Sequence, residues 1–121
     1  MKKILIVDDE PNIVMALEYT FRKNNFEVFI ARDGQEALDI LEQQTPDLII
    51  LDIMMPHVDG YATVTQIKQN PKLGRCKILF LSAKSKEAEI EKGLQLGADA
   101  YMTKPFSIKK LLEQADALLE P

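Results

Sequence analysis

The sequence predicts an α/β domain, in which a doubly wound sheet of five parallel strands is covered by five helices. Five short apolar runs alternate with longer segments of helical periodicity, which is the pattern of βαβ units. Three of these runs are continuously apolar and rich in branched residues, as expected for strands buried on both faces. The length of 121 residues fits one domain with a core of its own.

The expected strands are the apolar runs at residues 3–7, 28–30, 48–51, 78–81 and 100–102. Right-handed crossovers between parallel strands place helices on both faces of such a sheet. We find no internal repeat, linker or low-complexity tract between these runs. A single domain over residues 1–121 is therefore expected.

The first two helices have clear start and stop signals. Pro11 suits a first helical turn, and apolar residues follow at four-residue spacing, namely Ile13, Leu17 and Phe21. Asp33 and Glu36 form a capping box ahead of the second apolar stripe. Pro46 ends that segment before the next strand.

Three further helices are expected along the chain. The segment 59–70 has a weaker apolar side and ends at Pro71. Ser85 is the expected N-cap of the fourth helix, and Gly97 is its expected C-terminal stop. Ser107 is the expected N-cap of the last helix, which carries one continuous apolar stripe.

Composition and charge exclude several classes of protein. Apolar residues make up 46% and charged residues 28%, which is an ordinary globular composition rather than a disordered one. The net charge of -4 gives no basic footprint, so direct nucleic-acid binding is not expected. No apolar run approaches the ~20 residues of a membrane helix, so no membrane span is expected. One cysteine cannot make an internal disulfide or a cysteine-based zinc site. The apolar run at 4–7 is too short for a signal peptide, and a cytoplasmic protein is expected.

Polar residues follow four of the five expected strands. Asp8 and Asp9 come after the first strand, and Asp52 comes after the third. Ser82 follows the fourth strand and Lys104 the fifth. In open α/β sheets, ligands bind beyond the carboxyl ends of the strands, where the strand order reverses. With the strand order 2-1-3-4-5, the first and third strands are neighbours at that reversal, and the three carboxylates crowd one crevice.

This group of side chains predicts a site for a divalent cation and a phosphate. Three neighbouring carboxylates repel one another unless a counter-charge is present, and both a metal ion and Lys104 can supply one. Oxygen ligands without sulfur favour Mg²⁺, or Mn²⁺, over zinc. Neither glycine-rich phosphate-binding motif occurs, so a metal, a hydroxyl and an ammonium must handle the phosphate. Singly, each residue is an ordinary loop residue; together they indicate phosphoryl transfer.

Longer segments around these residues match a known family pattern. They are ILIVDDE at 4–10, DLIILDIMMP at 47–56, DG at 59–60, LSA at 81–83, GADAY at 97–101 and TKPF at 103–106. With them, the chain resembles bacterial two-component response-regulator receiver domains, such as chemotaxis regulators, over its whole length. The resemblance implies a flavodoxin-like fold and a phosphoprotein that works in phosphorelay signal transduction.

The resemblance also implies a role for each residue of the site. Asp52 would be the phosphoacceptor, and Lys104 would pair with the phosphoryl oxygens. Asp9 would bind Mg²⁺ directly, together with Asp52 and the backbone carbonyl of Met54. Asp8 would act mainly through metal-bound water. The domain would be a switch that promotes its own phosphorylation and dephosphorylation, and not a conventional enzyme.

Further residues would transmit or tune the switch. Ser82 would hydrogen-bond a phosphoryl oxygen, and Tyr101 would swing inward as it does. The peptide bond that follows Lys104 would be cis, since the next residue is a proline. Met54 and Lys84 are expected to flank the approach to the phosphoryl group and to affect its hydrolysis. Gly60 is expected at a backbone angle that suits glycine.

The resemblance implies partners as well. A sensor histidine kinase or a phosphotransfer protein would donate the phosphoryl group. An effector domain or target protein would bind the surface of the fourth helix, the fifth strand and the last helix, and a phosphorylation-dependent homodimer is a further expectation. Ala100 stands where DNA-binding relatives commonly have an aspartate, which argues against the usual charged dimer interface. The sequence leaves open the kinase, the signal, the output and any domain beyond residue 121.

Three alternatives remain at this point. A receiver-like interaction module without phosphorylation would keep the fold, but it would not need the full set of Asp9, Asp52, Ser82 and Lys104. A Mg²⁺-dependent phosphatase of the haloacid dehalogenase type needs an Asp-x-Asp start, which Asp8 and Asp9 do not supply. A flavodoxin-like cofactor protein needs a Ser/Thr/Gly-rich loop after the first strand, where this chain has acids.

Overall fold

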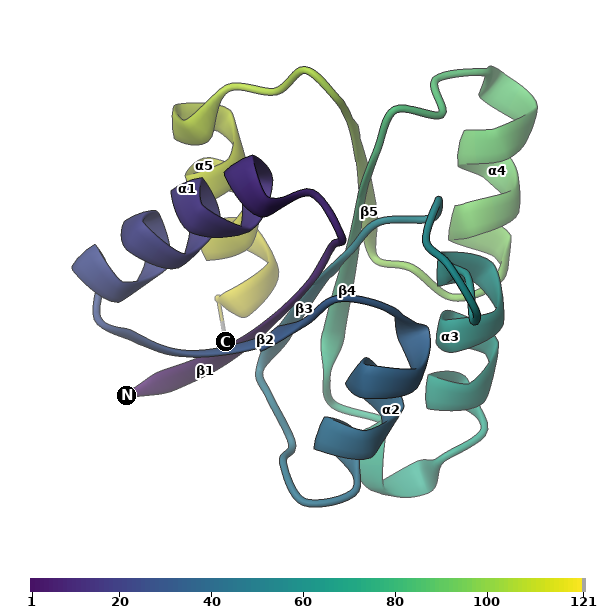
Figure 1. Ribbon diagram of the computed structural model, residues 1–121, viewed down its shortest axis with the longest axis horizontal. Coiled ribbons are helices and arrows are strands. Elements are labelled where there is room, and N and C mark those ends of the chain that lie inside the picture. Colours follow the sequence, from purple (N-terminus) through teal and green to yellow (C-terminus); the bar gives the residue numbers. More distant parts are fainter. Residues whose placement is uncertain (121) are drawn as a thin grey trace.

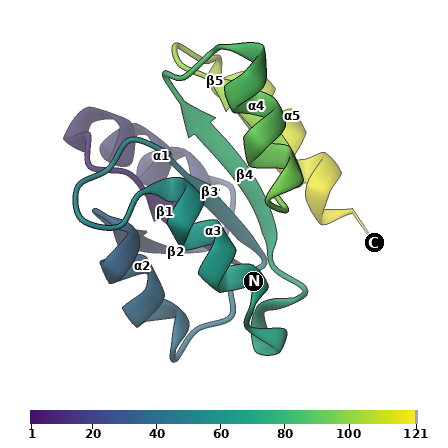
Figure 2. The same ribbon diagram turned by 90° about the vertical axis from the view of Figure 1, so that its right-hand side faces the viewer.

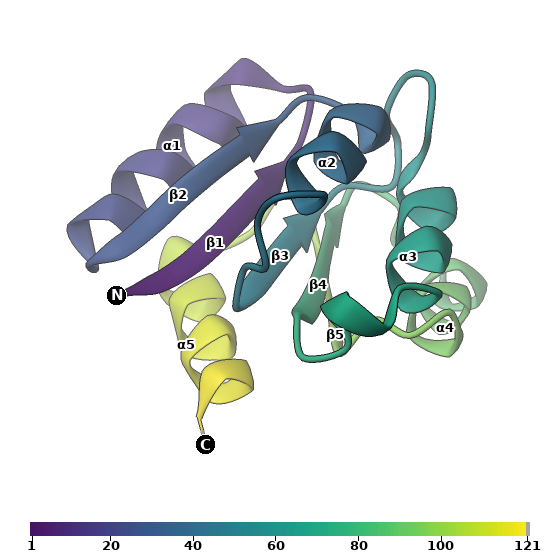
Figure 3. The same cartoon turned by 90° about the horizontal axis from the view of Figure 1, so that it is seen from below.

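The computed structural model describes residues 1–120 and has the predicted sheet. Its five strands are parallel and lie in the order β2-β1-β3-β4-β5, as Figure 3 shows from below. Their bounds are β1 Lys2–Val7, β2 Phe26–Ala31, β3 Leu48–Leu51, β4 Lys77–Ser82 and β5 Ala100–Thr103. The prediction of strand order and number is therefore confirmed, and the strands extend the apolar runs by two residues or fewer at each end.

Helices cover both faces of the sheet (Figure 1). Their bounds are α1 Pro11–Lys23, α2 Gly34–Leu41, α3 Gly60–Lys68, α4 Glu87–Gln95 and α5 Ile108–Leu119, with a short 3-10 turn at Pro71–Leu73. Helices α1 and α5 lie on one face, and Figure 2 views the other face, which α2, α3 and α4 cover. Over residues 1–120, no helix combines the length and the apolar character that a membrane span requires.

Two hydrophobic cores follow from this doubly wound arrangement. Along β1, Ile4 and Ile6 belong to the core under α1 and α5, while Leu5 and Val7 belong to the core under α2 and α3. Alternation along a strand explains the division, because successive side chains point to opposite faces of the sheet. All of β3 is buried, which accounts for its continuous apolar run.

The predicted caps of α2 and α5 are present, and α3 has a side-chain cap that was not predicted. The side chains of Asp33, Asp59 and Ser107 accept hydrogen bonds from backbone N–H groups in the first turns of α2, α3 and α5. The predicted cap of α4 is wrong: Lys86, and not Ser85, is the N-cap residue, and it makes no side-chain cap. Two glutamates in the first turn of α4 complement the positive end of the helix dipole instead.

Two glycines show different reasons for their presence. Gly97 follows α4 with φ +119, a left-handed backbone that favours glycine and ends the helix as predicted. Gly60 has no such angle; a Cβ there would lie 2.4 Å from the backbone oxygen of Asp52. The expected explanation for Gly60 is therefore wrong. This glycine permits α3 to begin directly against the loop that carries Asp52.

At the amino ends of the strands, carboxylates form hydrogen bonds that link neighbouring strands of the sheet. An Asp47 Oδ accepts a hydrogen bond from the backbone N–H of Lys3 at 2.8 Å. In the same way, an Asp99 Oδ accepts the backbone N–H of Ile78 at 2.8 Å. Both aspartates stand just before a strand, so each ties its strand to the neighbouring one. These carboxylates complete the backbone hydrogen bonding at this edge of the sheet.

Candidate functional site

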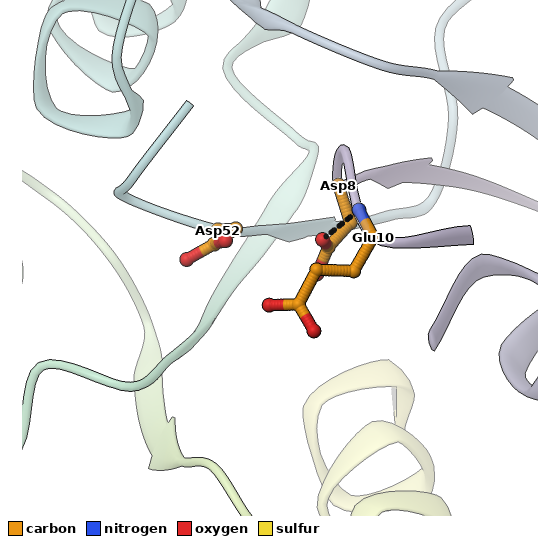
Figure 4. Close-up of side chains that lie close together, drawn as sticks. All are labelled: Asp8, Glu10 and Asp52. Carbon is orange, nitrogen blue, oxygen red and sulfur yellow. Dashed lines mark hydrogen bonds between the residues drawn. The ribbon is translucent and has the colours of Figure 1, made fainter. Parts of the chain in front are cut away.

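The candidate site lies at the carboxyl ends of β1 and β3, which are hydrogen-bonded neighbours. Asp8 follows β1 and Asp52 follows β3, and each is only 3% exposed. Glu10 adds a third carboxylate from the solvent side. One oxygen of each of these three residues lies within 4.8 Å of the others (Figure 4). The topology thus brings together residues that are more than 40 positions apart in the sequence.

Lys104 supplies the positive charge for this cluster. Its Nζ lies 2.9 Å from Asp8 Oδ2, 3.0 Å from Glu10 Oε1 and 3.4 Å from Asp52 Oδ2. The side chain of Lys104 is 10% exposed, so little solvent screens these contacts. The loop after β5 thereby delivers its ammonium to the carboxyl edge of β1 and β3, as the strand order predicts.

Backbone amides fix the two buried carboxylates. The N–H of Glu10 donates to Asp8 Oδ1 at 2.9 Å, which is the dashed line in Figure 4. The N–H of Met54 donates to Asp52 Oδ1 at 3.3 Å. Each buried carboxylate therefore has one oxygen on a backbone amide two residues along the chain. The other oxygen of each carboxylate faces Lys104.

Burial and charge act against each other in the cluster. Burial raises the pKa of the Asp8 carboxyl above its ordinary value, although Lys104 and the amide of Glu10 pull it down. Burial alone would lower the pKa of Lys104, but its hydrogen bonds to Asp8 and Glu10 outweigh burial and hold that pKa above its ordinary value. Lys104 is therefore charged at neutral pH, and Asp8 is a carboxylate in an environment that disfavours its charge.

The donor set fits a hard divalent cation. Three carboxylates and one ammonium leave a net charge of about -2 when all are ionised. All the side-chain ligand atoms are oxygens, which Mg²⁺ and Mn²⁺ prefer, and no sulfur takes part. The residues of this edge can thus hold such an ion, with Asp8 and Asp52 as the buried part of the set.

The structure distributes the acidic run differently from the sequence expectation. Asp9 is exposed and is not one of the three clustered carboxylates; it lines a groove beside α1. Glu10, for which no role was predicted, brings its carboxylate to the cluster instead. The signal for Glu10 was its place in the same acidic run. Only the path of the loop decides which of these side chains turns inward.

The two predicted switch residues meet at the start of the loop between β4 and α4. Ser82 is fully buried, and its Oγ accepts a hydrogen bond from the N–H of Lys84 at 3.3 Å. The hydroxyl of Tyr101 donates to the backbone carbonyl of Lys84 at 2.7 Å. Burial raises the pKa of Tyr101 to about 12, so the hydroxyl keeps its proton at neutral pH. The backbone of Lys84 in this loop therefore contacts the side chains of both Ser82 and Tyr101.

Two remaining expectations concern the backbone. The peptide bond between Lys104 and Pro105 is cis, as predicted. The N–H of Met54 donates to Asp52, and the carbonyl of Met54 is the group that the family resemblance implies as a metal ligand. That assignment stays a prediction, as do the roles of Asp9, Asp8 and Asp52 as metal ligands.

The fold and the acidic edge define a class of protein, and comparisons with known proteins identify it. The family model for the response regulator receiver domain matches residues 4–116. The chain belongs to this family, whose members accept a phosphoryl group on an aspartate with the help of Mg²⁺. Receiver domains of this kind partner with histidine kinases and with effector domains.

The relatives include regulators of several kinds. The chain is 45% identical over 118 residues to the alkaline phosphatase synthesis transcriptional regulatory protein PhoP of Bacillus subtilis, of which the match covers 48%. It thus spans about half the length of that relative. Two solved structures cover 98% of this chain. The signal receiver domain of a histidine kinase from Syntrophus aciditrophicus has 33% identity, 90% of its chain covered and a TM-score of 0.90. The chemotaxis response regulator CheY4 of Vibrio cholerae has 30% identity, 99% of its chain covered and a TM-score of 0.92.

Proposed function

We propose that Asp52 is the phosphoacceptor of this receiver domain and that its phosphorylation switches a binding surface. The observation that carries the proposal is the placement of the Asp52 carboxylate, buried at the carboxyl edge of β3 and 3.4 Å from the Lys104 ammonium. The Lys104 ammonium would therefore lie close to a phosphoryl group on Asp52 without any rearrangement of the site. Ser82, buried at the end of the neighbouring strand β4, is the hydroxyl proposed to reach it.

The proposed reaction needs positioning and charge more than covalent chemistry. An oxygen of Asp52 attacks the phosphorus of a phosphohistidine on a kinase, and the bond from phosphorus to the imidazole nitrogen breaks. Phosphoryl transfer depends mainly on alignment and on neutralised charge. Asp8 and Asp52, with Glu10 or Asp9, would hold Mg²⁺, or Mn²⁺, which when bound neutralises the phosphoryl oxygens and aligns them.

Phosphorylation would change the balance of contacts at this edge. It turns the single negative charge of Asp52 into about two and adds acceptor oxygens. Lys104 and Ser82 can then make charge-assisted hydrogen bonds that the unmodified protein lacks. These new bonds favour a second conformation by their differential energy. Tyr101, already bonded to the loop between β4 and α4, is the side chain proposed to transmit the change.

The proposed output is a protein contact on the face of α4, β5 and α5. In this view, residues 1–121 act as one domain that is a switch and not a turnover enzyme, and the cytoplasm is its proposed location. The partner there is an effector domain, a target protein or, after phosphorylation, a second copy. The relatives support this range, because their names include a transcriptional regulator, a histidine kinase and a chemotaxis regulator.

The test is the intact mass of the protein incubated with acetyl phosphate, with and without Mg²⁺. We expect a Mg²⁺-dependent gain of one phosphoryl group in the parent protein and none in Asp52→Asn. A phosphorylated histidine kinase serves as the second donor if acetyl phosphate fails. A gain that persists in Asp52→Asn would assign the acceptor elsewhere. No gain with either donor would favour the alternative, a receiver-like interaction module that binds without phosphorylation.

A further inference from the structure

Helix α4 buries very little of its own surface against the domain. Within Glu87–Gln95, which the structure describes in full, Gly93 is the only buried residue, and Leu94 is exposed. By contrast, α3 buries four residues, among them Val64 and Ile67. Elements with few buried apolar contacts are the ones that open or shift most readily. Helix α4 is therefore the element on this face whose position depends most on contacts other than apolar burial.

The one buried residue of α4 rests on a row of aromatic rings. The ring of Phe80 in β4 packs against Tyr61 at 5.9 Å and against Tyr101 at 5.8 Å between centroids. A Cβ at Gly93 would lie 3.0 Å from the Phe80 ring and 3.2 Å from the Tyr101 ring. Interdigitated side chains are what normally fix how a helix packs. Since Gly93 inserts no side chain between these rings, apolar packing alone does not fix α4 at this point.

Polar contacts hold the first turn of α4 instead. The hydroxyl of Tyr61 on α3 donates to the backbone carbonyl of Glu89 at 3.1 Å, and Lys92 Nζ lies 4.3 Å from the centre of the Tyr61 ring. Burial raises the pKa of Tyr61, so its hydroxyl keeps the proton that it donates at neutral pH. Lys84 Nζ also lies 2.9 Å from Glu89 Oε2, but both side chains are partly exposed, and such ion pairs contribute little. The Tyr61 side chain is therefore the main polar tie between α3 and α4.

This tie joins a helix that is fixed to the site and a helix that follows the switch loop. Helix α3 begins directly against the backbone of Asp52. Helix α4 follows the loop of Lys84, whose N–H donates to Ser82 and whose carbonyl accepts from Tyr101. Only two residues separate Lys84 from the start of α4, so a shift of this loop passes to the first turn of the helix. The hydrogen bond of Tyr61 thus connects α3, which stays with the site, to the part that the proposed switch would move.

We propose that Tyr61 is a positioning residue whose hydroxyl holds the first turn of α4 in the resting conformation and so opposes the change that a phosphoryl group on Asp52 drives. The inference rests on the proposed phosphorylation of Asp52. It concerns the balance between two conformations and adds Tyr61, on α3, to Ser82 and Tyr101. Loss of the Tyr61 hydroxyl raises the fraction of protein in the switched conformation, and a ligand that selects this conformation then binds more tightly.

The experiment titrates the protein with beryllofluoride in the presence of Mg²⁺ and follows bound fluoride by ¹⁹F NMR. Beryllofluoride binds reversibly to a carboxylate oxygen and resembles a phosphoryl group, so its affinity reports the conformational balance and not a rate of transfer or hydrolysis. Tyr61→Phe keeps the ring and removes only the hydroxyl. We expect it to lower the Kd by about two- to tenfold, the range that the net contribution of one hydrogen bond allows. Hydrogen exchange should become faster in α4 and stay unchanged in β3.

Tyr19 on α1 provides the matched control. Its side chain is exposed, its ring also lies near a lysine ammonium, that of Lys23, and its hydroxyl makes no hydrogen bond within residues 1–120. Tyr19→Phe should leave the Kd unchanged. An equal or higher Kd in Tyr61→Phe than in the parent would overturn the inference, because the hydroxyl would then serve only the stability of the fold. If the parent binds no beryllofluoride and gains no phosphoryl mass, the proposed function fails first and this inference fails with it.

Discussion

Aspartates lie at both the amino and the carboxyl ends of the strands, which we call the amino and the carboxyl edge of the sheet, and they have different roles at the two edges. At the amino edge, the carboxylates of Asp47 and Asp99 accept backbone N–H groups of the neighbouring strands at 2.8 Å. At the carboxyl edge, Asp8 and Asp52 likewise each give one oxygen to a backbone amide, but that amide lies two residues along their own loop. Their other oxygens converge on the single ammonium of Lys104.

The difference teaches how to separate structural carboxylates from reactive ones in this fold. A carboxylate bonded to backbone amides is stabilised by groups that the fold holds in place. Carboxylates gathered around one flexible ammonium repel one another and leave charge that a cation or a phosphoryl group can engage. The amino edge therefore contributes stability, whereas the carboxyl edge retains a destabilised arrangement that a ligand can relieve.

Removal of the Lys104 ammonium is the strongest test of this comparison. Lys104→Met leaves buried Asp8 and Asp52 without their counter-charge, so we expect the free energy of unfolding to fall by about 3 kcal/mol in the absence of divalent cations. Chemical denaturation measures it. Mg²⁺ should recover part of the loss, because it replaces the missing positive charge.

Lys109 provides the control for that variant, because it is an exposed lysine on α5. Lys109→Met should leave the free energy of unfolding within about 0.5 kcal/mol of the parent. If Lys104→Met and Lys109→Met have the same stability, the ammonium does not hold the carboxyl edge together.

The amino edge should respond to a substitution at Asp47. Asp47→Ala leaves the N–H of Lys3 without its acceptor, and we expect the free energy of unfolding to fall by about 2 kcal/mol. Asp47→Asn keeps an acceptor oxygen and should lose less. The loss should be the same with and without Mg²⁺. A deficit that Mg²⁺ cancels would mean that Asp47 also binds a cation, and the contrast between the edges would then be false.

Substitution of Asp8 should raise the free energy of unfolding, in contrast to the substitutions of Lys104 and Asp47. Asp8→Asn removes a carboxylate whose charge is disfavoured by burial and by Asp52, so the free energy of unfolding should rise by about 1 kcal/mol at neutral pH without divalent cations. Mg²⁺ should stabilise the parent protein and stabilise the variant less. Chemical denaturation of both proteins, with and without Mg²⁺, gives the comparison.

The pH dependence of the Asp8 variant checks its physical cause. Because the folded protein raises the pKa of Asp8, it binds this proton more tightly than the unfolded chain does. The contribution of Asp8 to stability is therefore present below its ordinary value of about 4 and is lost as pH rises through the raised pKa. The free energy of unfolding of Asp8→Asn should therefore exceed that of the parent protein by an amount that grows as pH rises through that interval. An advantage that is constant with pH would contradict the explanation.

The local sequence was sufficient for most of the fold. Apolar runs predicted every strand, and the run is unbroken in β3, which is buried on both faces. Asp33 and Ser107 were predicted as caps, because a cap satisfies backbone groups only two or three residues away. The cap of α4 was predicted at the wrong residue. The helix begins after Lys86 without a side-chain cap, and two glutamates in its first turn interact with the helix dipole instead.

The sequence also located the site by a simple argument. Parallel strands bring their carboxyl ends to one edge, so counting the residues after each strand found Asp8, Asp52, Ser82 and Lys104. The structure places these four side chains at that edge, with Asp8, Asp52 and Ser82 buried. Order along the chain and strand topology are enough for this result, because neither depends on the detailed path of a loop.

Only the tertiary structure decided which neighbours face the site. The turn after β1 directs Glu10, and not Asp9, toward Lys104, and no local pattern separates two adjacent acids. Gly60 is needed because α3 approaches the backbone of Asp52, a contact between segments that pattern alone does not reveal. The contacts among Tyr61, Glu89 and Lys84 join α3, α4 and the loop between β4 and α4. Sequence periodicity reports which face of an element is buried, whereas contacts between elements depend on how their backbones pack in space.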